Sequence, residues 1–455
     1  MTRFELDEPG GNWLPRIDGV TLLTTFLLIR LGLPSQLVVG PLGGAGSPAT
    51  LLGIGLLALW GWYRLHRGTP YRAAPINAAV GIFAVSVGLS YAVASTRPIA
   101  AEEYSVATLT LVTLAGWLGG LLVASDGMTS LERLTTIVKR LVLLGGLFAS
   151  FGLFQFLTGS AWVNQLSIPG LTANQILYAL TVREGFNRPM GTAIHPIEFG
   201  SIIGMLMPLM IAYWLGLDPG TKRRGIRAIA AWWPAAAGAM AIALSSSRSA
   251  LVGLAVGVIG LVPVLTRAQR LIALIAAACL AAFIFLAVPG MVGTVLGLFT
   301  GVSTDPSVAS RVESYAIAFA YIARAPILGR GMGTFLPRYR IFDNQYLLTL
   351  VETGFVGVAA LVVLSLSALV PATRMVLRAP AASPQRLLAG CLFASCLVGT
   401  VCLAFFDGFS FPMMPGLWFV VMGLAGAGYR LTRLAPRQRS STSQSSSTGE
   451  RSLIR

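Results

Sequence analysis

Charged residues are scarce in this sequence. Only 11% of its 455 residues are Asp, Glu, Lys or Arg, whereas a typical soluble domain carries about 25%. Hydrophobic residues make up 55%, and the mean hydropathy is +0.75. This balance disfavours a soluble globular domain and favours a protein that crosses a membrane many times.

Histidine and cysteine are also rare. His66 and His195 are the only histidines, which excludes a metal site built from several histidines. The four cysteines lie in apolar runs, as is typical of small buried residues rather than of disulfides or metal ligands. They are Cys279, Cys391, Cys396 and Cys402. We expect neither a metal nor a cofactor.

Several common motifs are missing. No GxxxxGK[ST] phosphate-binding loop occurs, and the glycines at 329–333 only superficially resemble a dinucleotide loop, because no strand precedes them. The N-terminus lacks a cleavable signal peptide, so we expect the first apolar segment to remain. The net charge of +16 does not indicate a nucleic-acid partner, because the arginines are distributed as membrane topology requires.

Twelve apolar segments approach the roughly 20 residues that a membrane crossing needs. We expect an all-α polytopic helical bundle in one transmembrane domain, residues 1–434. The Ser-rich residues 435–455 are expected to form a disordered cytoplasmic tail. The twelve segments are residues 18–38, 47–63, 75–95, 104–125, 137–158, 196–217, 226–244, 249–266, 270–288, 346–370, 386–406 and 412–430.

Basic residues predict the orientation of these segments. With both termini in the cytoplasm, 23 Lys and Arg residues fall on cytoplasmic segments, nine arginines fall on outer segments, and Arg30 lies within the first span. The expected location is therefore the cytoplasmic (inner) membrane. Two outer loops are long, at about 159–195 and 289–345, and such loops are commonly functional. The nine outer arginines need an explanation other than topology.

Arg248 follows three serines at the predicted outer start of a spanning helix. Free backbone N–H groups, the positive end of a helix and a guanidinium together form an anion site. The paired donors of arginine also suit a diphosphate. Arg183 and Arg188, in the first long loop, are candidates to complete a diphosphate clamp. The alternative is that Arg248 only extends to the lipid headgroups.

The second long outer loop contains most of a polar segment, residues 310–354. Ser310 and Glu313 predict a capping box at the start of a short amphipathic helix, which Pro326 would end. Arg311 on this helix either contacts an anionic ligand or points into water. The helix is expected to lie at the membrane surface.

Asp343 stands just before the tenth predicted span. It is either a helix cap or a general base exposed to the outer solution, with Asn344 beside it as a supporting residue. Glu352 follows two turns later, within the predicted span, where a carboxylate needs a polar partner.

Three further positions carry weaker signals. His195 precedes Pro196 at a helix start, which is more typical of a structural contact than of a catalyst, and it is kept as a supporting residue. Glu102 and Glu103 are either a solvated pair or a cation site. Asp407, in the last outer connection, would lie near the same end of the bundle.

Three segments resemble the O-antigen ligase and O-antigen polymerase superfamily of bacterial membrane glycosyltransferases. They read FNRPMGTAIHPIEFGSIIGMLMPLM at 186–210, SSSRSALVGLAVG at 245–257, and SRVESYAIAFAYIARAPILGRGMGTF with FDNQYLLTLVETGFVG at 310–357. The resemblance covers about 186–430. It implies metal-independent transfer of a glycan from undecaprenyl diphosphate to a hydroxyl on a glycan or glycolipid acceptor. The expected place is the outer face of the membrane, during synthesis of surface polysaccharide.

By position, the resemblance implies that Arg248 and an arginine of residues 183–188 bind the diphosphate. The family's ligases usually have His-Asn before the tenth span, and that histidine is expected to activate the acceptor. This chain has Asp343 and Asn344 there, as some polymerase-like members do, so ligase and polymerase both stay open. The alternative is a transporter or flippase of lipid-linked glycans or small anions, but transporters concentrate their polar residues at mid-membrane.

Overall fold

The computed structural model describes residues 18–66, 74–174, 180–183, 185–217, 231–287 and 306–449. Side chains are described for these residues except Arg183, Ala287, residues 306–312 and residues 434–449. The α-helices are α1 (Gly19–Gly32), α2 (Pro48–His66), α3 (Pro75–Ser95), α4 (Ala101–Asp126), α5 (Leu131–Thr158), α6 (Pro196–Trp214), α8 (Trp233–Leu244), α9 (Arg248–Leu261), α10 (Arg267–Ala287), α12 (Pro306–Arg324), α13 (Gln345–Arg378), α14 (Pro384–Cys402) and α15 (Met414–Gly449).

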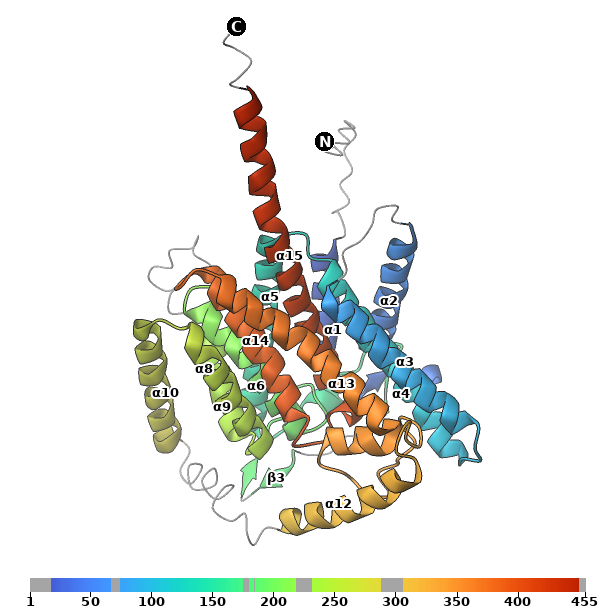
Figure 1. Cartoon of the computed structure of the whole chain (residues 1–455). Helices are drawn as coiled ribbons and strands as arrows, with labels where there is room; N and C mark the ends of the chain where they lie inside the picture. The colour runs from blue at the N-terminus through green and yellow to red at the C-terminus, as the bar shows by residue number, and fades with distance from the viewer. Residues whose placement is uncertain are drawn as a thin grey trace.

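Strands are few and short in the described residues. β1 (Leu37–Val38) pairs with β2 (Thr172–Ala173), and β3 (Val182–Arg183) pairs with β4 (Phe186–Asn187), both in antiparallel register. The long helices run between two ends of the molecule (Figure 1). α15 finishes at one end, whereas α12 and β3 lie at the opposite end, which we call the α12 end.

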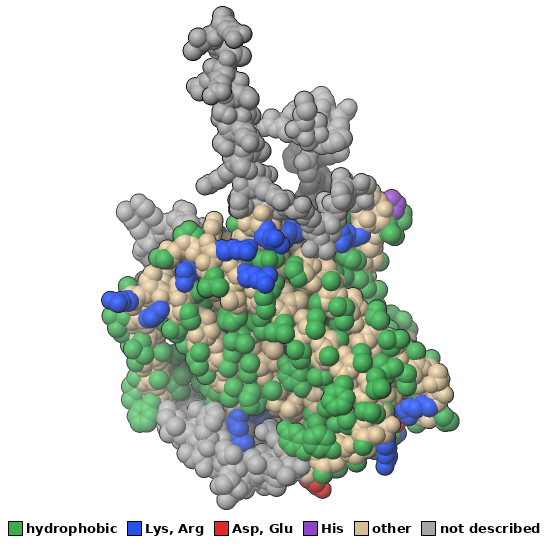
Figure 2. Space-filling view, viewed as in Figure 1, with side chains coloured by type: hydrophobic (Ala, Val, Ile, Leu, Met, Phe, Trp, Pro, Cys, Tyr) green, Lys and Arg blue, Asp and Glu red, His purple; other side chains and the backbone are tan. Residues whose placement is uncertain are grey.

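Each of the twelve predicted segments overlaps one helix of the described residues. Seven helices are long and apolar enough to cross a membrane, or up to eight if residues 40–46 and α2 form one bent span. α1, α8 and α9 are apolar but shorter than the roughly 20 residues of a full crossing. Figure 2 shows a broad hydrophobic band, with basic side chains gathered along its edge on the α15 side. The all-α membrane class is confirmed, while twelve crossings stay a prediction.

Two buried charges hold the start of α15 in place. Arg30 is 2% exposed, and its Nη1 donates to the carbonyl oxygen of Pro412 at 2.7 Å. Glu198 is fully buried, and its Oε1 accepts the N–H groups of Met413 (2.6 Å) and Met414 (3.1 Å). These bonds fasten one turn of backbone to the end of α1 and the start of α6. The sequence pattern singled out Arg30 but not Glu198.

α13 is interrupted at Gly354, where φ is 64° and ψ is −166°. A Cβ at this position would lie 2.3 Å from the carbonyl oxygen of Ile327, and a Cβ at Gly329 would lie 2.3 Å from that of Glu352. Two backbone segments therefore cross in direct contact, which only glycine permits. The expected tenth span is thus two helical pieces, and Glu352 lies in the first.

The helix expected from Ser310 begins four residues earlier, at Pro306, and ends at Arg324. The predicted start was wrong because proline is itself favoured in the first helical turn. The side chain of Glu313, assigned to a capping box, is instead bonded to Arg340, whose Nη2 lies 3.0 Å from its Oε2. The predicted end before Pro326 is confirmed.

Replacing Gly354 with alanine should destabilise the fold by about 2 kcal/mol or more, since the positive φ and the clash with Ile327 both oppose a Cβ. Thermal unfolding of the detergent-solubilised protein measures the effect. Gly81→Ala on α3 is the matched control, because no atom lies within 4 Å of its added Cβ; it should leave stability unchanged or slightly higher. Equal melting temperatures for the two variants would contradict the crossing.

Candidate functional site

Four segments outside the α-helices meet at the α12 end of the bundle. They are residues 185–195 before α6, 245–247 between α8 and α9, 342–344 before α13, and 403–413 between α14 and α15. The contacts that join them are Arg188 Nε to Ser245 O (2.8 Å), Gln345 N to Leu403 O (2.8 Å), Cys402 Sγ to Ser249 O (3.9 Å), and the rings of His195 and Phe411 (6.0 Å between centroids).

Arg248 is the first residue of α9, directly after the helix break. Ser246 in the break has a φ of 46°, an uncommon conformation for a residue other than glycine. Ser247 occupies the N-cap position without a side-chain capping bond, and its hydroxyl lies 3.0 Å from that of Ser249. The first N–H groups of α9 therefore lack a side-chain cap, next to a half-buried guanidinium. This is the arrangement that suits an anion.

Arg188 comes from the β3–β4 side and reaches the same break. Its Nε donates to the carbonyl oxygen of Ser245, three residues before Arg248. The two arginines predicted to share a ligand are thus brought to one place by the tertiary structure. The side chains of Arg183 and Arg311, the other two predicted diphosphate contacts, lie outside the described residues; their backbones are in β3 and α12.

His195 caps α6. Its Nδ1 accepts the N–H of Ile197 at 3.1 Å. Burial, and then the positive charge of Arg188, lower the pKa of His195 to about 4. The imidazole is therefore neutral at ordinary pH, with Nδ1 occupied as an acceptor. This geometry matches the structural contact expected of it.

Asn344, rather than Asp343, is the cap of α13. Asn344 Oδ1 accepts the N–H groups of Tyr346 (3.0 Å) and Leu347 (3.2 Å). The half-buried carboxylate of Asp343 is therefore not used as the N-cap. The sequence allowed Asp343 to be either a helix cap or a general base. The capping interpretation is wrong for Asp343, because Asn344 is the cap.

Asp407 is a second carboxylate beside Asp343. Burial is the main cause that raises the pKa of Asp407 to about 6, and the negative charge of Asp343 contributes to this rise. The buried side chain of Gln345 keeps the two segments together, because its Oε1 accepts the N–H of Phe409 at 2.8 Å. The only sequence signal was a short polar stretch, DGFSFP, between two apolar segments.

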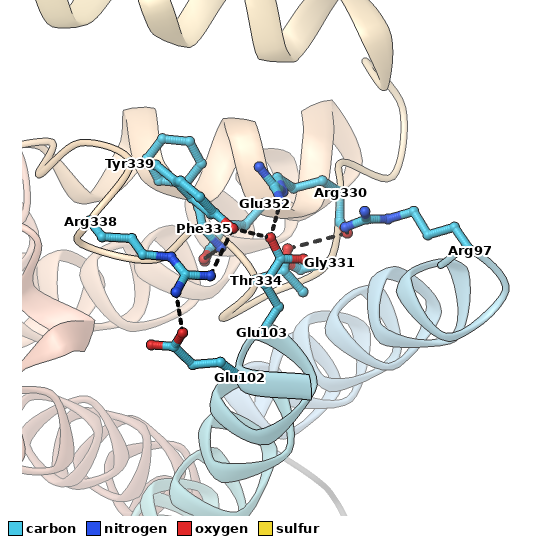
Figure 3. A network of polar contacts seen from close by, with 10 residues as sticks. All are labelled: Arg97, Glu102, Glu103, Arg330, Gly331, Thr334, Phe335, Arg338, Tyr339 and Glu352. Atoms are coloured by element: carbon cyan, nitrogen blue, oxygen red, sulfur yellow. Dashed lines mark hydrogen bonds and ion pairs between the residues drawn. The ribbon is translucent and has the colours of Figure 1, made fainter. Parts of the chain in front are cut away.

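Other arginines that the sequence predicts on the outer side are engaged elsewhere, in the contacts drawn in Figure 3. Arg330 Nη2 lies 2.7 Å from Oε1 of Glu103, which also accepts the hydroxyl of Tyr339 at 2.7 Å. Arg97 donates to the carbonyl oxygen of Arg330 at 2.6 Å. Glu103 is only 5% exposed, so its interpretation as a solvated residue was wrong. These bonds tie the loop before α13 to the tip between α3 and α4.

Two further ion pairs hold the same loop, each through an exposed carboxylate. Arg338 pairs with Glu102, and Arg340 Nη2 lies 3.0 Å from Glu313 Oε2. Exposed pairs of this kind contribute about 0–1 kcal/mol each. Their carboxylate partners account for the positions of Arg338 and Arg340.

Glu352 also holds this loop. It is 5% exposed, its Oε1 accepts the N–H of Phe335 at 3.2 Å, and its carbonyl oxygen accepts the N–H of Gly331 at 2.8 Å. Ser90 Oγ on α3 donates to the same carbonyl at 2.8 Å. The polar partner that a buried carboxylate requires is therefore the loop backbone.

Asp407→Asn should stabilise the protein at pH 7.5 but not at pH 4. A carboxyl whose pKa is raised from 3.8 to about 6 favours its neutral form in the folded state. Ionising Asp407 therefore costs folding free energy. This cost is absent below the pKa of the unfolded state, grows between the two pKa values, and reaches at most about 3 kcal/mol above the pKa of the folded state. Melting curves at the two pH values measure it; the same shift at both would contradict the raised pKa.

No curated protein sequence matches the chain. Residues 233–362 match the family model of O-antigen ligase. The match runs from α8 through the helix break at Arg248 and the segment of Asp343 into α13. It therefore confirms the resemblance of this chain to the O-antigen ligase and polymerase superfamily.

Proposed function

We propose that the protein transfers a glycan from a polyprenyl diphosphate, in bacteria undecaprenyl diphosphate, to a hydroxyl acceptor at the outer face of the cytoplasmic membrane. The observation that carries the proposal is the meeting of two arginines, an uncapped helix start and two carboxylates at one end of an apolar bundle. An anion attached to a lipid fits such a place, because its chain remains in the bilayer while its charge lies at the interface.

The donor diphosphate would bind between Arg188 and the start of α9. Arg248 and the N–H groups in the first turn of α9 would supply positive charge next to the breaking bond, where charge develops in the transition state. No metal ion or cofactor is needed in this scheme, because guanidinium groups neutralise the leaving diphosphate. The 2.8 Å bond from Arg188 to Ser245 would keep the two sides of the clamp together.

Asp343 would activate the acceptor. The acceptor hydroxyl oxygen bonds to the anomeric carbon while the bond from that carbon to the diphosphate oxygen breaks. The hydroxyl proton passes to the Asp343 carboxylate, and the electron pair leaves with the polyprenyl diphosphate. One displacement of this kind inverts the anomeric centre. Asp407, with its raised pKa, lies beside Asp343 as a second group able to hold the proton.

The membrane arrangement follows from the same proposal. Twelve crossings with both termini in the cytoplasm would place the α12 end outside, where lipid-linked glycans are available and nucleotide sugars are not. The basic edge on the α15 side (Figure 2) agrees with a cytoplasmic position under the positive-inside rule. A cysteine introduced at Tyr315, which is 44% exposed on α12, would then react with an impermeant thiol reagent in intact spheroplasts. If this cysteine reacted only after lysis, the outer placement of α12 would be wrong.

Arg248→Ala and Asp343→Asn should each lower the transfer rate by about 100-fold or more, the usual cost of losing one transition-state donor or a general base. The assay uses purified protein in detergent with a polyprenyl-diphosphate-linked oligosaccharide and scores the product. Arg338→Ala is the matched control, because Arg338 is an outer arginine in an exposed ion pair with Glu102. It should retain most of the rate.

Near-normal transfer by folded Arg248→Ala or Asp343→Asn protein would overturn those assignments. Product formation in detergent also decides against a transporter, since no barrier is then present to cross. Ligase and polymerase are separated by the surface glycans of a deletion strain. Loss of long chains with short ones retained identifies a polymerase, whereas accumulated lipid-linked polymer identifies a ligase.

A further inference from the structure

An apolar groove opens between α1, α5 and the segment that follows α5. Its cavity volume is about 460 Å³, within the range of small-molecule sites. Leu28 and Leu147 on its rim are 50% and 61% exposed, so the groove opens sideways where lipid would surround the bundle. Residues that line it include Leu28, Leu31, Leu147, Phe148, Trp162 and Leu166.

Trp162 is held at this groove in a strained conformation. Its φ is 60° and its ψ −28°, which is unusual for a bulky residue. The indole Nε1 donates to Thr158 Oγ1 at 2.7 Å, and the ring lies against that of Phe154 with 5.4 Å between centroids. Strain of this kind persists only where the surrounding contacts impose it, and it is concentrated at ligand sites. The apolar wall is therefore preformed.

The wall at the α12 end is the backbone turn at 190–193. Thr192 Oγ1 donates to the carbonyl oxygen of Leu31 at 2.7 Å, and the Thr192 carbonyl accepts the N–H of Ser35 at 2.9 Å. The buried amide of Gln155 accepts the N–H of Gly191 at 2.7 Å and donates to its carbonyl at 2.9 Å. α1, α5 and the turn are thus fixed to one another.

This turn connects the groove to the charged site. Thr192 lines the groove, while Arg188 and His195 stand four residues before it and three residues after it. The hydroxyl of Thr192 is already bonded to Leu31, so this end offers hydrocarbon contact rather than sugar contact. A ligand with an anionic head group and a single apolar chain suits this arrangement, because its head would lie at the charged site while its chain fills the groove.

We propose that the groove binds the polyprenyl chain of the donor, in the units nearest the diphosphate. The inference rests on the proposed function, since it takes the donor from there. A single isoprenoid chain is favoured over a diacyl phospholipid, because a cavity of about 460 Å³ is small for two acyl chains and because Thr192, which lines it, is four residues from Arg188. It predicts that α1 and α5, which lie outside the matched residues 233–362, select the lipid carrier.

Gly32→Phe tests the groove directly. Gly32 lines it, and no atom lies within 4 Å of an added Cβ, so phenylalanine fills the space without displacing backbone. The KM for a long-chain donor should rise at least tenfold with kcat nearly unchanged, while a donor that carries a methyl group in place of the polyprenyl chain should be unaffected. Gly88→Phe on α3 is the matched control, equally open but away from the groove; its constants should stay within twofold.

A second pair of variants tests the groove independently, in case Gly32→Phe impairs folding. Leu147→Trp fills the groove from its exposed rim, and Leu157→Trp places the same side chain on α5, 81% exposed and outside the lining. Only the first should raise the KM for the long-chain donor. Equal effects within both pairs, or none in either groove variant, would overturn the proposal.

Photolabelling separates this inference from the proposed function. Polyprenyl diphosphate with a diazirine near the head should label residues 28–32 and 144–151 of wild-type protein in nanodiscs, and excess unlabelled polyprenyl diphosphate should remove the label. Equal labelling by a diazirine phospholipid, or undiminished labelling of Gly32→Phe, would overturn the groove assignment. Labelling without any glycan transfer would support the groove assignment and contradict the proposed transferase function. Transfer without labelling would support the transferase function and contradict the groove assignment.

Discussion

Backbone N–H and C=O groups need partners wherever helices are interrupted, and at membrane depth the protein itself must supply them. At the α12 end, four buried acids or amides meet this need. Gln155 binds the turn at Gly191, Glu198 binds the N–H groups at 413–414, Gln345 binds Phe409, and Glu352 binds Phe335. The non-helical segments that carry the candidate site depend on these bonds for their positions.

The same bonds explain why the site is assembled from distant parts of the chain. Glu198 joins the segment of His195, through the N–H of Ile194 at 3.3 Å, to the start of α15. Gln345, two residues after Asp343, fixes the loop of Asp407. Rigid placement of this kind suits a transferase, because a carboxylate and a diphosphate clamp must face one substrate in a fixed geometry.

Much of the fold could be predicted from the sequence, because apolar runs of membrane length leave the backbone no alternative to helix. The site could be predicted only in part. Arg248 was recognisable because a charge beside a helix start has a local physical meaning. Glu103 was misread, since its partner Arg330 lies 227 positions away. Asp407 was left out of the site because its short polar loop does not reveal that Asp343 is its neighbour.

The sequence by itself determined the class of protein, the order of its helices and the resemblance carried by three segments, because hydropathy and short motifs are local properties. Only the tertiary structure decided which carboxylates hold Arg330, Arg338 and Arg340, and that Arg188 reaches the break before α9. It also decided that α13 is broken at Gly354 and that an apolar groove is lined by Thr192, four residues after Arg188. These features arise from contacts between segments far apart in the chain, and no local pattern encodes which of them will meet.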